Sequence, residues 1–366
     1  MIRKIFKILM FIVGGIVFLL LILAGILWIK SPGTTASITD VNGNVIEGSI
    51  SVIEKIRLGG LEQYVIIRGA STEKPVMLFL HGGPGSPEIA FMKHFNTDIE
   101  NDFIMVYWEQ RGSGKSFTND IPVESMTLEQ FISDTREISE YLAKRFSQEK
   151  IYVMGHSWGS LLGILTAYEH PELFHAYFGI GQVAQQLRGE KISFQWVKER
   201  ASFERDEDAM KALSEMNFPD SGASNSDWVN FLLNERKYVA QFGGSMQEMK
   251  GMWPMIKLFL GAEEYTFNEK LNYMKGSLFS LNLLFPEVIN ADLFSKIDSM
   301  QIPVYIFQGT HDYQTPYVVA KDFYDQLKAP EKELFTFSKS AHSPLMEEAE
   351  KFNSIVREKA RRIENQ

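Results

Sequence analysis

The sequence predicts an α/β fold, in which helices flank a mostly parallel β-sheet, with an inserted helical lid and one transmembrane helix before it. Three observations lead to this prediction. Short apolar runs of strand length alternate with helical stretches between residues 76 and 182 and again between 292 and 360, which is typical of parallel sheets. Residues 183–291 interrupt that alternation with helical stretches only. The chain also begins with a long apolar run.

The first segment, residues 1–30, is predicted to be a transmembrane anchor. No charged residue occurs between Ile8 and Ile29, and about 20 apolar residues suffice to cross a bilayer as a helix. Two alternatives remain open. A cleaved signal peptide would use the small residues at 34–36, although its apolar core is usually only about 7–15 residues long. A buried core helix would not be apolar on every side.

The charges around this segment predict its orientation. Arg3, Lys4 and Lys7 precede the apolar run, and only Lys30 follows it closely. The positive-inside rule then places the N-terminus in the cytoplasm and the catalytic domain outside the cell membrane, as a single-pass protein. Residues 31–37 form a short linker, so we expect the domain to lie close to the membrane surface.

The rest of the chain divides into a core and a lid. The core is predicted to comprise residues 38–182 and 292–366, and the lid residues 183–291. A turn at Asn42-Gly43 indicates an initial hairpin, and two strands around Gly59-Gly60 would open the sheet in antiparallel fashion. The expected strands are 50–56, 63–67, 76–80, 103–108, 151–154, 175–180, 304–307 and 333–337, and the expected core helices include 128–146 and 317–327.

A candidate nucleophile lies in the segment Gly155-His156-Ser157-Trp158-Gly159. This G-x-S-x-G pattern follows a β-prone run and precedes an apolar helix, the context in which a sharp turn exposes a serine hydroxyl. Glycine on both sides of the serine relieves the clash that a Cβ atom would cause. We therefore predict that Ser157 is a nucleophile, which needs a base to accept its proton.

The acid and the base are predicted downstream of Ser157. Asp312 follows the strand 304–307, and His342 follows the next strand, so both lie where parallel sheets place their chemistry. The order serine, acid, histidine is that of α/β-hydrolases. His311 is the rival base, but a side chain next to the acid in sequence usually points elsewhere, so His342 is preferred.

An oxyanion hole is predicted in the turn after the strand 76–80. This turn reads His81-Gly82-Gly83-Pro84-Gly85, and its exposed N–H groups can point at a ligand. The N–H of Trp158 is expected to supply one donor, and that of Gly83, or alternatively Gly82, the other. An ordinary turn is the alternative for this segment taken alone.

These motifs together resemble the proline iminopeptidase branch of the α/β-hydrolases. The resemblance covers roughly residues 50–182 and 292–360 and includes the segment from Trp108 to Ser116. The chain differs from the usual pattern in having Glu109 in place of Asp and His156 in place of Gly. Glu109 and Arg111 are expected to form an ion pair that braces their loop. His156 is expected to pack or hydrogen-bond beneath the elbow, which is the sharp turn that carries Ser157.

The resemblance also implies how a substrate would be held. That family binds the free amino group of its substrate with acidic residues of the lid. The acidic lid residues that could do so are Glu190, Glu204, Glu248, Glu263, Glu264 and Glu269.

Composition excludes several other functions. The formal net charge of −9 and the absence of a basic aromatic patch argue against nucleic-acid binding. The chain has no cysteine, which excludes disulfides, a thiol nucleophile and cysteine-based zinc sites. No His and carboxylate spacing suggests a metal, and no cofactor is expected. The expected partners are a short-peptide or small-molecule substrate and the lipid bilayer, and the oligomeric state stays open.

The sequence thus predicts a membrane-anchored serine hydrolase that works through an acyl-enzyme. The resemblance implies an aminopeptidase that acts on short peptides with N-terminal proline or another small apolar residue. A carboxylesterase or lactonase of the same fold is the enzymatic alternative. A catalytically silent binding module at the cell surface is the alternative from another class.

Overall fold

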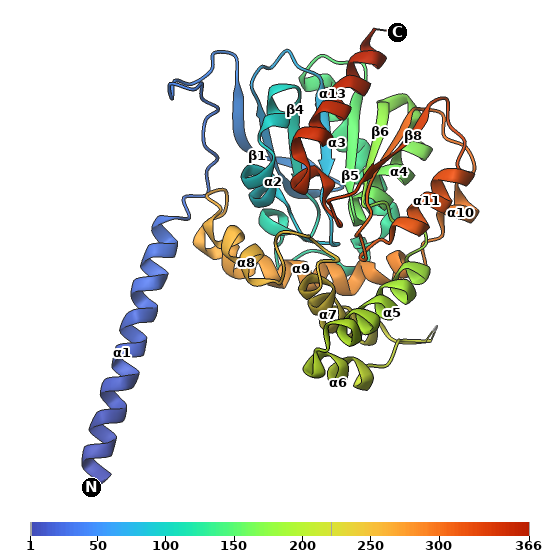
Figure 1. The fold of residues 1–366 in the computed structure, drawn as a ribbon. Coiled ribbons are helices and arrows are strands. Elements are labelled where there is room, and N and C mark those ends of the chain that lie inside the picture. The colour runs from blue at the N-terminus through green and yellow to red at the C-terminus, as the bar shows by residue number, and fades with distance from the viewer. Residues whose placement is uncertain (1, 221, 366) are drawn as a thin grey trace.

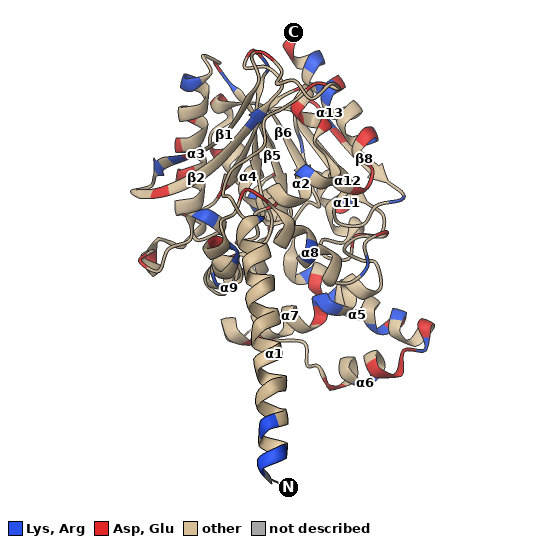
Figure 2. Cartoon of the chain, turned by 90° about the vertical axis from the view of Figure 1, so that its left-hand side faces the viewer, with Lys and Arg blue, Asp and Glu red and all other residues tan. Residues whose placement is uncertain are grey.

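The computed structural model describes residues 2–220 and 222–365. Helix α1 (Ile2–Ile29) projects away from the rest of the protein (Figure 1). It is long and apolar enough to cross a membrane. Its most apolar stretch of 18 residues has a mean hydropathy of 3.0, and none of that stretch is buried in the protein. The alternative of a buried core helix is therefore wrong. Figure 2 shows the basic residues gathered at the N-terminal end of this helix.

One sheet of eight strands forms the centre of the molecule. Its order is β1-β2-β4-β3-β5-β6-β7-β8. Strands β1 and β2 pair antiparallel with each other, as do β2 and β4, and every later pair is parallel. The prediction of an α/β fold with a mostly parallel sheet is confirmed. The strands are β1 (Ile50–Leu58), β2 (Leu61–Gly69), β3 (Val76–Leu80), β4 (Ile104–Glu109), β5 (Ile151–His156), β6 (Phe174–Ile180), β7 (Val304–Gly309) and β8 (Lys332–Phe337).

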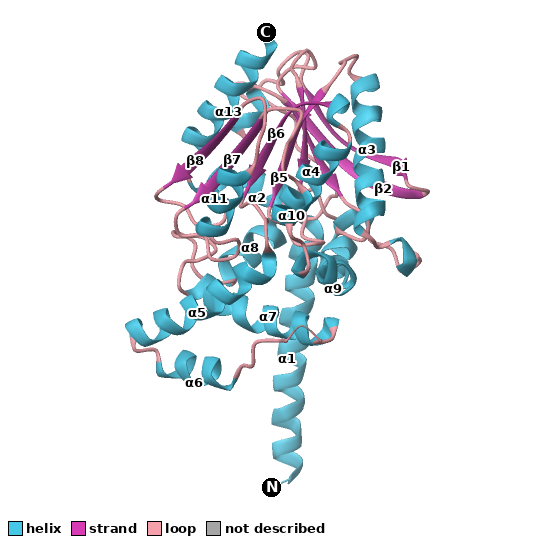
Figure 3. Cartoon of the chain, turned by 90° about the vertical axis from the view of Figure 1, so that its right-hand side faces the viewer, coloured by secondary structure: helices cyan, strands magenta, loops and turns pink. Residues whose placement is uncertain are grey.

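Helices cover both faces of this sheet (Figure 3). On one face α3, α4 and α11 contribute apolar residues such as Phe131, Leu161 and Phe323 to the core. On the other face α2 and α13 contribute Met92 and Phe352. Because both faces are covered, β3 and β5 are buried at every residue, which explains their continuous apolar sequence. These helices are α2 (Ile89–Phe95), α3 (Leu128–Arg145), α4 (Trp158–Glu169), α11 (Tyr317–Gln326), α12 (Pro344–Glu347) and α13 (Ala349–Glu364).

Five further helices, α5–α9, form a group that we call the lid. They lie beyond the edge of the sheet at which the parallel strands end (Figure 1). Phe194, Phe218, Trp228 and Phe231 pack against one another in an aromatic cluster within the lid. The lid helices and the short helix after them are α5 (Gln186–Glu204), α6 (Glu207–Glu215), α7 (Asn225–Gln241), α8 (Trp253–Gly261), α9 (Phe267–Ile289) and α10 (Leu293–Lys296).

The shorter features agree with the sequence as well. The predicted turn at Asn42-Gly43 joins Thr39 and Val45, which form an isolated bridge.

Four short 3₁₀ helices occur in loops of the core, within the described residues. They are η1 (Asp98–Asn101), η2 (Gly114–Ser116), η3 (Val123–Ser125) and η4 (Pro171–Leu173).

Candidate active site

Ser157 lies at the tip of the turn between β5 and α4. Its backbone has φ 55° and ψ −122°, a conformation that costs energy for a residue with a side chain. A Cβ atom at Gly155 would lie 2.8 Å from the Cα of Ser160, and one at Gly159 would lie 2.8 Å from the carbonyl oxygen of His81. The two glycines therefore allow the turn to pack tightly, and the turn presents the serine as predicted.

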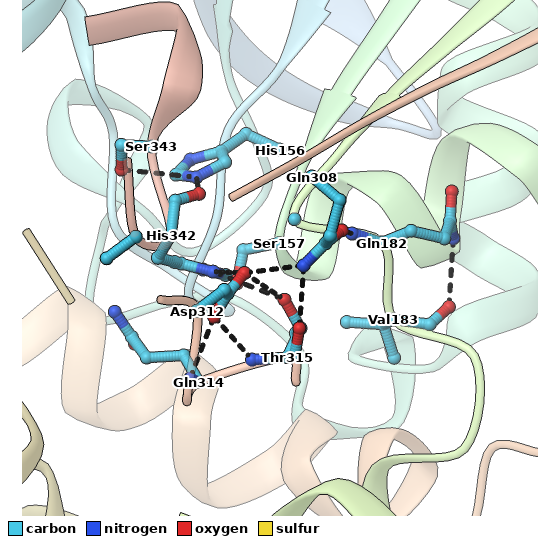
Figure 4. Close-up of polar contacts among 12 residues, drawn as sticks. His156, Ser157, Gln182, Val183, Gln308, Asp312, Gln314, Thr315, His342 and Ser343 are labelled. Carbon is cyan, nitrogen blue, oxygen red and sulfur yellow. Dashed lines mark hydrogen bonds and ion pairs between the residues drawn. The ribbon is translucent and has the colours of Figure 1, made fainter. Parts of the chain in front are cut away.

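His342 and Asp312 meet in front of this turn (Figure 4). The Nδ1 atom of His342 lies 2.8 Å from the Oδ2 atom of Asp312, and both side chains are buried. The rival histidine, His311, is exposed. The geometry thus brings the preferred histidine, and not its rival, to the acid.

The Asp312 carboxylate is held by four further hydrogen bonds. The backbone N–H groups of Gln314 and Thr315 donate to Oδ1 at 2.9 Å each. The Thr315 hydroxyl and the Gln308 amide each donate to Oδ2 at 2.8 Å. These donors fix the carboxylate in place, so that it orients the imidazole of His342.

The other nitrogen of His342 is not engaged by Asp312. Its Nε2 atom is buried and has no hydrogen-bond partner among the described residues. Gly181 packs against the ring, since a Cβ atom there would lie 2.8 Å from both Nδ1 and Cε1. Figure 4 shows Ser157 beside His342 and Asp312. With Nδ1 donating to Asp312, Nε2 is left as a proton acceptor.

The turn at residues 81–85, here called the oxyanion turn, passes directly beside Ser157. A Cβ atom at Gly82 would lie 3.1 Å from the Cβ of Ser157. Gly83 has φ 114° and is exposed. The N–H of Trp158 is the first of α4 and has no acceptor within the helix. The structure therefore brings Gly82 against the serine, with Gly83 next to Gly82 in the same turn and Trp158 directly after the serine.

The buried side chain of His81 holds the oxyanion turn in place through hydrogen bonds. The sequence did not reveal this role. Burial lowers the pKa of His81 to about 4, so the ring is neutral near pH 7. Its Nε2 atom accepts the backbone N–H of Gln110 at 3.2 Å. Nδ1 therefore carries the hydrogen and donates to the carbonyl oxygen of Gly82 at 2.8 Å.

A second histidine and carboxylate pair lies behind the first. The Nδ1 atom of His156 lies 2.7 Å from the Oε1 atom of Glu88, and its Nε2 atom lies 3.0 Å from the carbonyl oxygen of His342. The rings of His156 and His342 are 4.8 Å apart. His156 is thus the hydrogen-bonding residue predicted beneath the elbow. Its partner Glu88 was missed, because no local pattern connects residues 68 positions apart.

The environment of His156 favours its charged form. Burial alone would lower the pKa of His156, but the charge and hydrogen bond of Glu88 and the carbonyl of His342 outweigh it and raise the pKa. A protonated ring can donate to both acceptors at once. The Glu88–His156 pair therefore ties the backbone of the catalytic histidine candidate to the segment that follows the oxyanion turn.

Replacing Glu88 with Gln is expected to destabilise the protein more at pH 6 than at pH 9. The folded-state pKa of His156 lies above its ordinary value, so the stabilising effect of the pair is fully present below about pH 6.5 and is lost as the pH rises through the folded-state pKa. Urea unfolding of both proteins at the two pH values measures the difference. An equal loss at both pH values would contradict a charged His156.

One predicted contact is wrong. Arg111 does not pair with Glu109; it pairs with Asp134 of α3 at 3.0 Å, and both partners are buried. Glu109 instead accepts hydrogen bonds from the hydroxyl of Tyr265, at 2.7 Å, and from the backbone of Lys115. The reason is that β4 ends at Glu109, and the turn that follows sends Arg111 towards α3. Burial raises the pKa of Glu109 to about 7.

The lid also touches the loops that carry the acid and the histidine. The N–H of Tyr313 donates to the carbonyl of Gly244 at 3.1 Å, and the N–H of His342 donates to that of Ser245 at 3.0 Å. Glu347 accepts from the backbone of Gln247 at 2.5 Å and from that of Ala341 at 2.8 Å. A single lid segment therefore holds both the loop that carries Asp312 and the loop that carries His342. Within the described residues, no group of three or more His, Asp or Glu could hold a metal ion.

Known proteins resemble this chain in sequence and fold. A family model described as the α/β-hydrolase fold matches residues 75–349. The chain belongs to the α/β-hydrolase family. The probable aminopeptidase YbaC of Bacillus subtilis strain 168 is 31% identical over 316 residues, covering 86% of this chain and 97% of that protein. A proline iminopeptidase of Lactobacillus helveticus is 25% identical over 321 residues, covering 86% and 97%.

A solved structure agrees with these relatives. The crystal structure of proline iminopeptidase from Mycobacterium smegmatis has a TM-score of 0.60 and 16% identity, and covers 85% of this chain and 98% of that one. At that identity the likeness shows the fold. The predicted resemblance to proline iminopeptidases is confirmed, and the family assignment makes the chain a hydrolase.

Proposed function

We propose that this hydrolase is a membrane-anchored serine aminopeptidase that acts through an acyl-enzyme. The observation that supports it best is the state of His342, which lies beside the elbow serine. Its Nδ1 atom is hydrogen-bonded to Asp312, while its buried Nε2 atom has no hydrogen-bond partner among the described residues (Figure 4). Ser157 attacks the carbonyl carbon and passes its proton to this Nε2 atom. His342 then protonates the leaving amine, and Asp312 stabilises the charged ring.

Backbone donors complete the proposed mechanism. The tetrahedral intermediate carries a negative oxygen, which the N–H groups of Trp158 and of Gly83 or Gly82 stabilise. Water then attacks the acyl-enzyme with His342 as the base, and the acid product leaves. Because the donors are backbone groups, one at the start of α4 and one in the turn that His81 holds, they need no rearrangement as the charge develops.

Substrates with a free N-terminal amine are proposed because the relatives are named as aminopeptidases and proline iminopeptidases. Of the six acidic lid residues considered, Glu190 is 0% exposed and has an Oε2 atom without a hydrogen-bond partner among the described residues. Glu204 is paired with Arg200 on the surface, and Glu248 is exposed. The other three, Glu263, Glu264 and Glu269, are paired with lysines.

The surroundings of Glu190 suit a cation. Glu190 and the buried Glu235 share the single guanidinium of Arg236, so two carboxylates and one cation leave one negative charge. A substrate ammonium would balance that charge, because a buried charge is costly unless it is paired. Glu190 also accepts from the amide of Gln186 at 2.6 Å.

The same amide connects Glu190 to the catalytic loops. Besides Glu190, the Gln186 amide lies 3.3 Å from the carbonyl oxygen of Gln314, two residues beyond Asp312. Gly189, one residue before Glu190, packs against Pro316. The proposed amine site therefore lies one helical turn from the loop that holds the acid.

Replacing Glu190 with Gln is expected to lower kcat/KM for proline β-naphthylamide by roughly 10- to 100-fold, the loss of one charge-assisted hydrogen bond. Hydrolysis of p-nitrophenyl acetate, which has no amine, should change little. Glu204→Gln is the matched control, since Glu204 is a lid carboxylate of the same helix paired on the surface. Equal losses on both substrates would indicate a structural role for Glu190.

The same assay separates the alternative functions. Cleavage of esters alone, lost in Ser157→Ala, would identify a carboxylesterase or lactonase. Cleavage of neither substrate, together with no labelling by a fluorophosphonate, would favour the silent binding module.

The proposed location is the cell membrane, with α1 as its anchor, the N-terminus in the cytoplasm and the catalytic domain outside. The support is the length and apolarity of α1 and the basic residues before it. Deleting residues 1–30 should release the domain from membrane fractions. A soluble full-length product that has lost its N-terminus would show instead that the segment is a cleaved signal.

A further inference from the structure

Helix α8 carries large apolar side chains on its outer surface. Trp253 is 70% exposed and Ile256 41% exposed, and no residue of this nine-residue helix is buried. On its other side, Pro254 and Leu258 line a cavity of about 620 Å³ that separates α8 from α2. These outer apolar side chains are therefore open to solvent over much of their surface.

Helix α9 has a similar stripe. Phe267, at its N-terminus, stacks on Trp28 of α1, with ring centroids 6.3 Å apart. Leu271 and Met274 follow Phe267 at helical spacing and are 63% and 59% exposed. Residues at this spacing share one face of a helix, so this stripe continues from the residue that contacts the anchor.

The end of the anchor is fastened to both helices. The ammonium of Lys270 donates at 2.9 Å to the hydroxyl of Ser31 and at 2.9 Å to the carbonyl oxygen of Leu260, in the last turn of α8. Pro32 forms a bridge with Thr266, and the N–H of Gly33 donates to the carbonyl of Glu263 at 3.0 Å. The segment after α1 is therefore packed against the lid rather than free.

These contacts set the distance between the lid and the bilayer. Helix α1 ends at Ile29, and two residues span at most about 7 Å. If α1 crosses the membrane, Ser31 lies at the bilayer surface, and the last turn of α8 and the first turn of α9 lie there with it. Figure 1 shows α8 and α9 beside the upper end of α1.

We propose that α8 and the first half of α9 rest on the membrane, with Trp253, Ile256, Leu271 and Met274 in contact with lipid. This proposal rests on the proposed anchor. Trp253 is a residue type that settles at the boundary between headgroups and acyl chains. The membrane surface would then border the cavity between α8 and α2.

Site-directed spin labelling tests the proposal in the full-length chain, which has no native cysteine. Trp253→Cys and Leu271→Cys are each labelled after reconstitution into vesicles of phosphatidylcholine and phosphatidylglycerol. Leu20→Cys, in α1, serves as the lipid reference. Glu358→Cys, exposed on α13 at the end of the molecule away from α1, is the water reference. Collisions with oxygen report lipid, and collisions with a nickel chelate report water.

The expected result is that labels at 253 and 271 collide with the nickel chelate roughly threefold less than the label at 358, and more with oxygen. If the label at 20 is in lipid while those at 253 and 271 match the label at 358, the lid proposal is overturned and the anchor stands. If the label at 20 is itself in water, the anchor fails and the lid proposal falls with it. Far-UV circular dichroism of each variant shows that it is folded.

Discussion

Replacing Ser157 with Ala is expected to lower kcat/KM by a factor of roughly 10⁴ to 10⁶ on every substrate that the enzyme cleaves. The reason is that the remaining site can only activate water. Among the described residues, no other hydroxyl group hydrogen-bonds to the Nε2 atom of His342, and the oxyanion donors cannot replace a nucleophile. The substitution removes one atom from a half-buried side chain, in a turn whose packing depends on its glycines, so the melting temperature should stay close to that of the wild type.

The measurement is hydrolysis of proline β-naphthylamide and p-nitrophenyl acetate by both proteins, with fluorophosphonate labelling in parallel. Ser214→Ala is the matched control, because Ser214 is an exposed lid serine whose hydroxyl bonds only the carbonyl of Lys211. Retention of more than about a tenth of the activity in Ser157→Ala would exclude Ser157 as the nucleophile.

Most of the sheet and the position of the candidate triad could be predicted because their signals are local. A strand buried on both faces is a continuous apolar run, as β3 and β5 show. Parallel strands all end at one edge, so Ser157, Asp312 and His342 had to share it once each was placed after a strand. The preference for His342 over His311 likewise followed from the direction of neighbouring side chains.

The contacts that brace the site could not be predicted, because they join distant segments. His156 meets Glu88, and the lid carbonyls of Gly244 and Ser245 meet the two catalytic loops. Arg111 shows the error that results when only nearby partners are considered. Its partner, Asp134, lies on a helix 23 residues away, whereas Glu109, two residues away, faces Tyr265 of the lid.

Replacing Gly159 with Ala is expected to destabilise the protein by roughly 4 kcal/mol or more, which is more than most single substitutions cost. The new Cβ atom would overlap the carbonyl oxygen of Leu80 and would lie 2.6 Å from its carbonyl carbon. Both atoms belong to the backbone at the end of β3. That strand cannot move aside easily, since it pairs with β4 on one side and β5 on the other.

The matched control is Gly261→Ala, at the end of α8, where a Cβ atom would meet nothing within 4 Å. There the substitution should be neutral or stabilising by up to about 1 kcal/mol, because alanine favours helix more than glycine does. Urea unfolding of the full-length variants in detergent, followed by circular dichroism, gives both values. If Gly159→Ala unfolds within about 1 kcal/mol of the wild type, the elbow can shift away from β3. The strained conformation of Ser157 would then not depend on close packing against that strand.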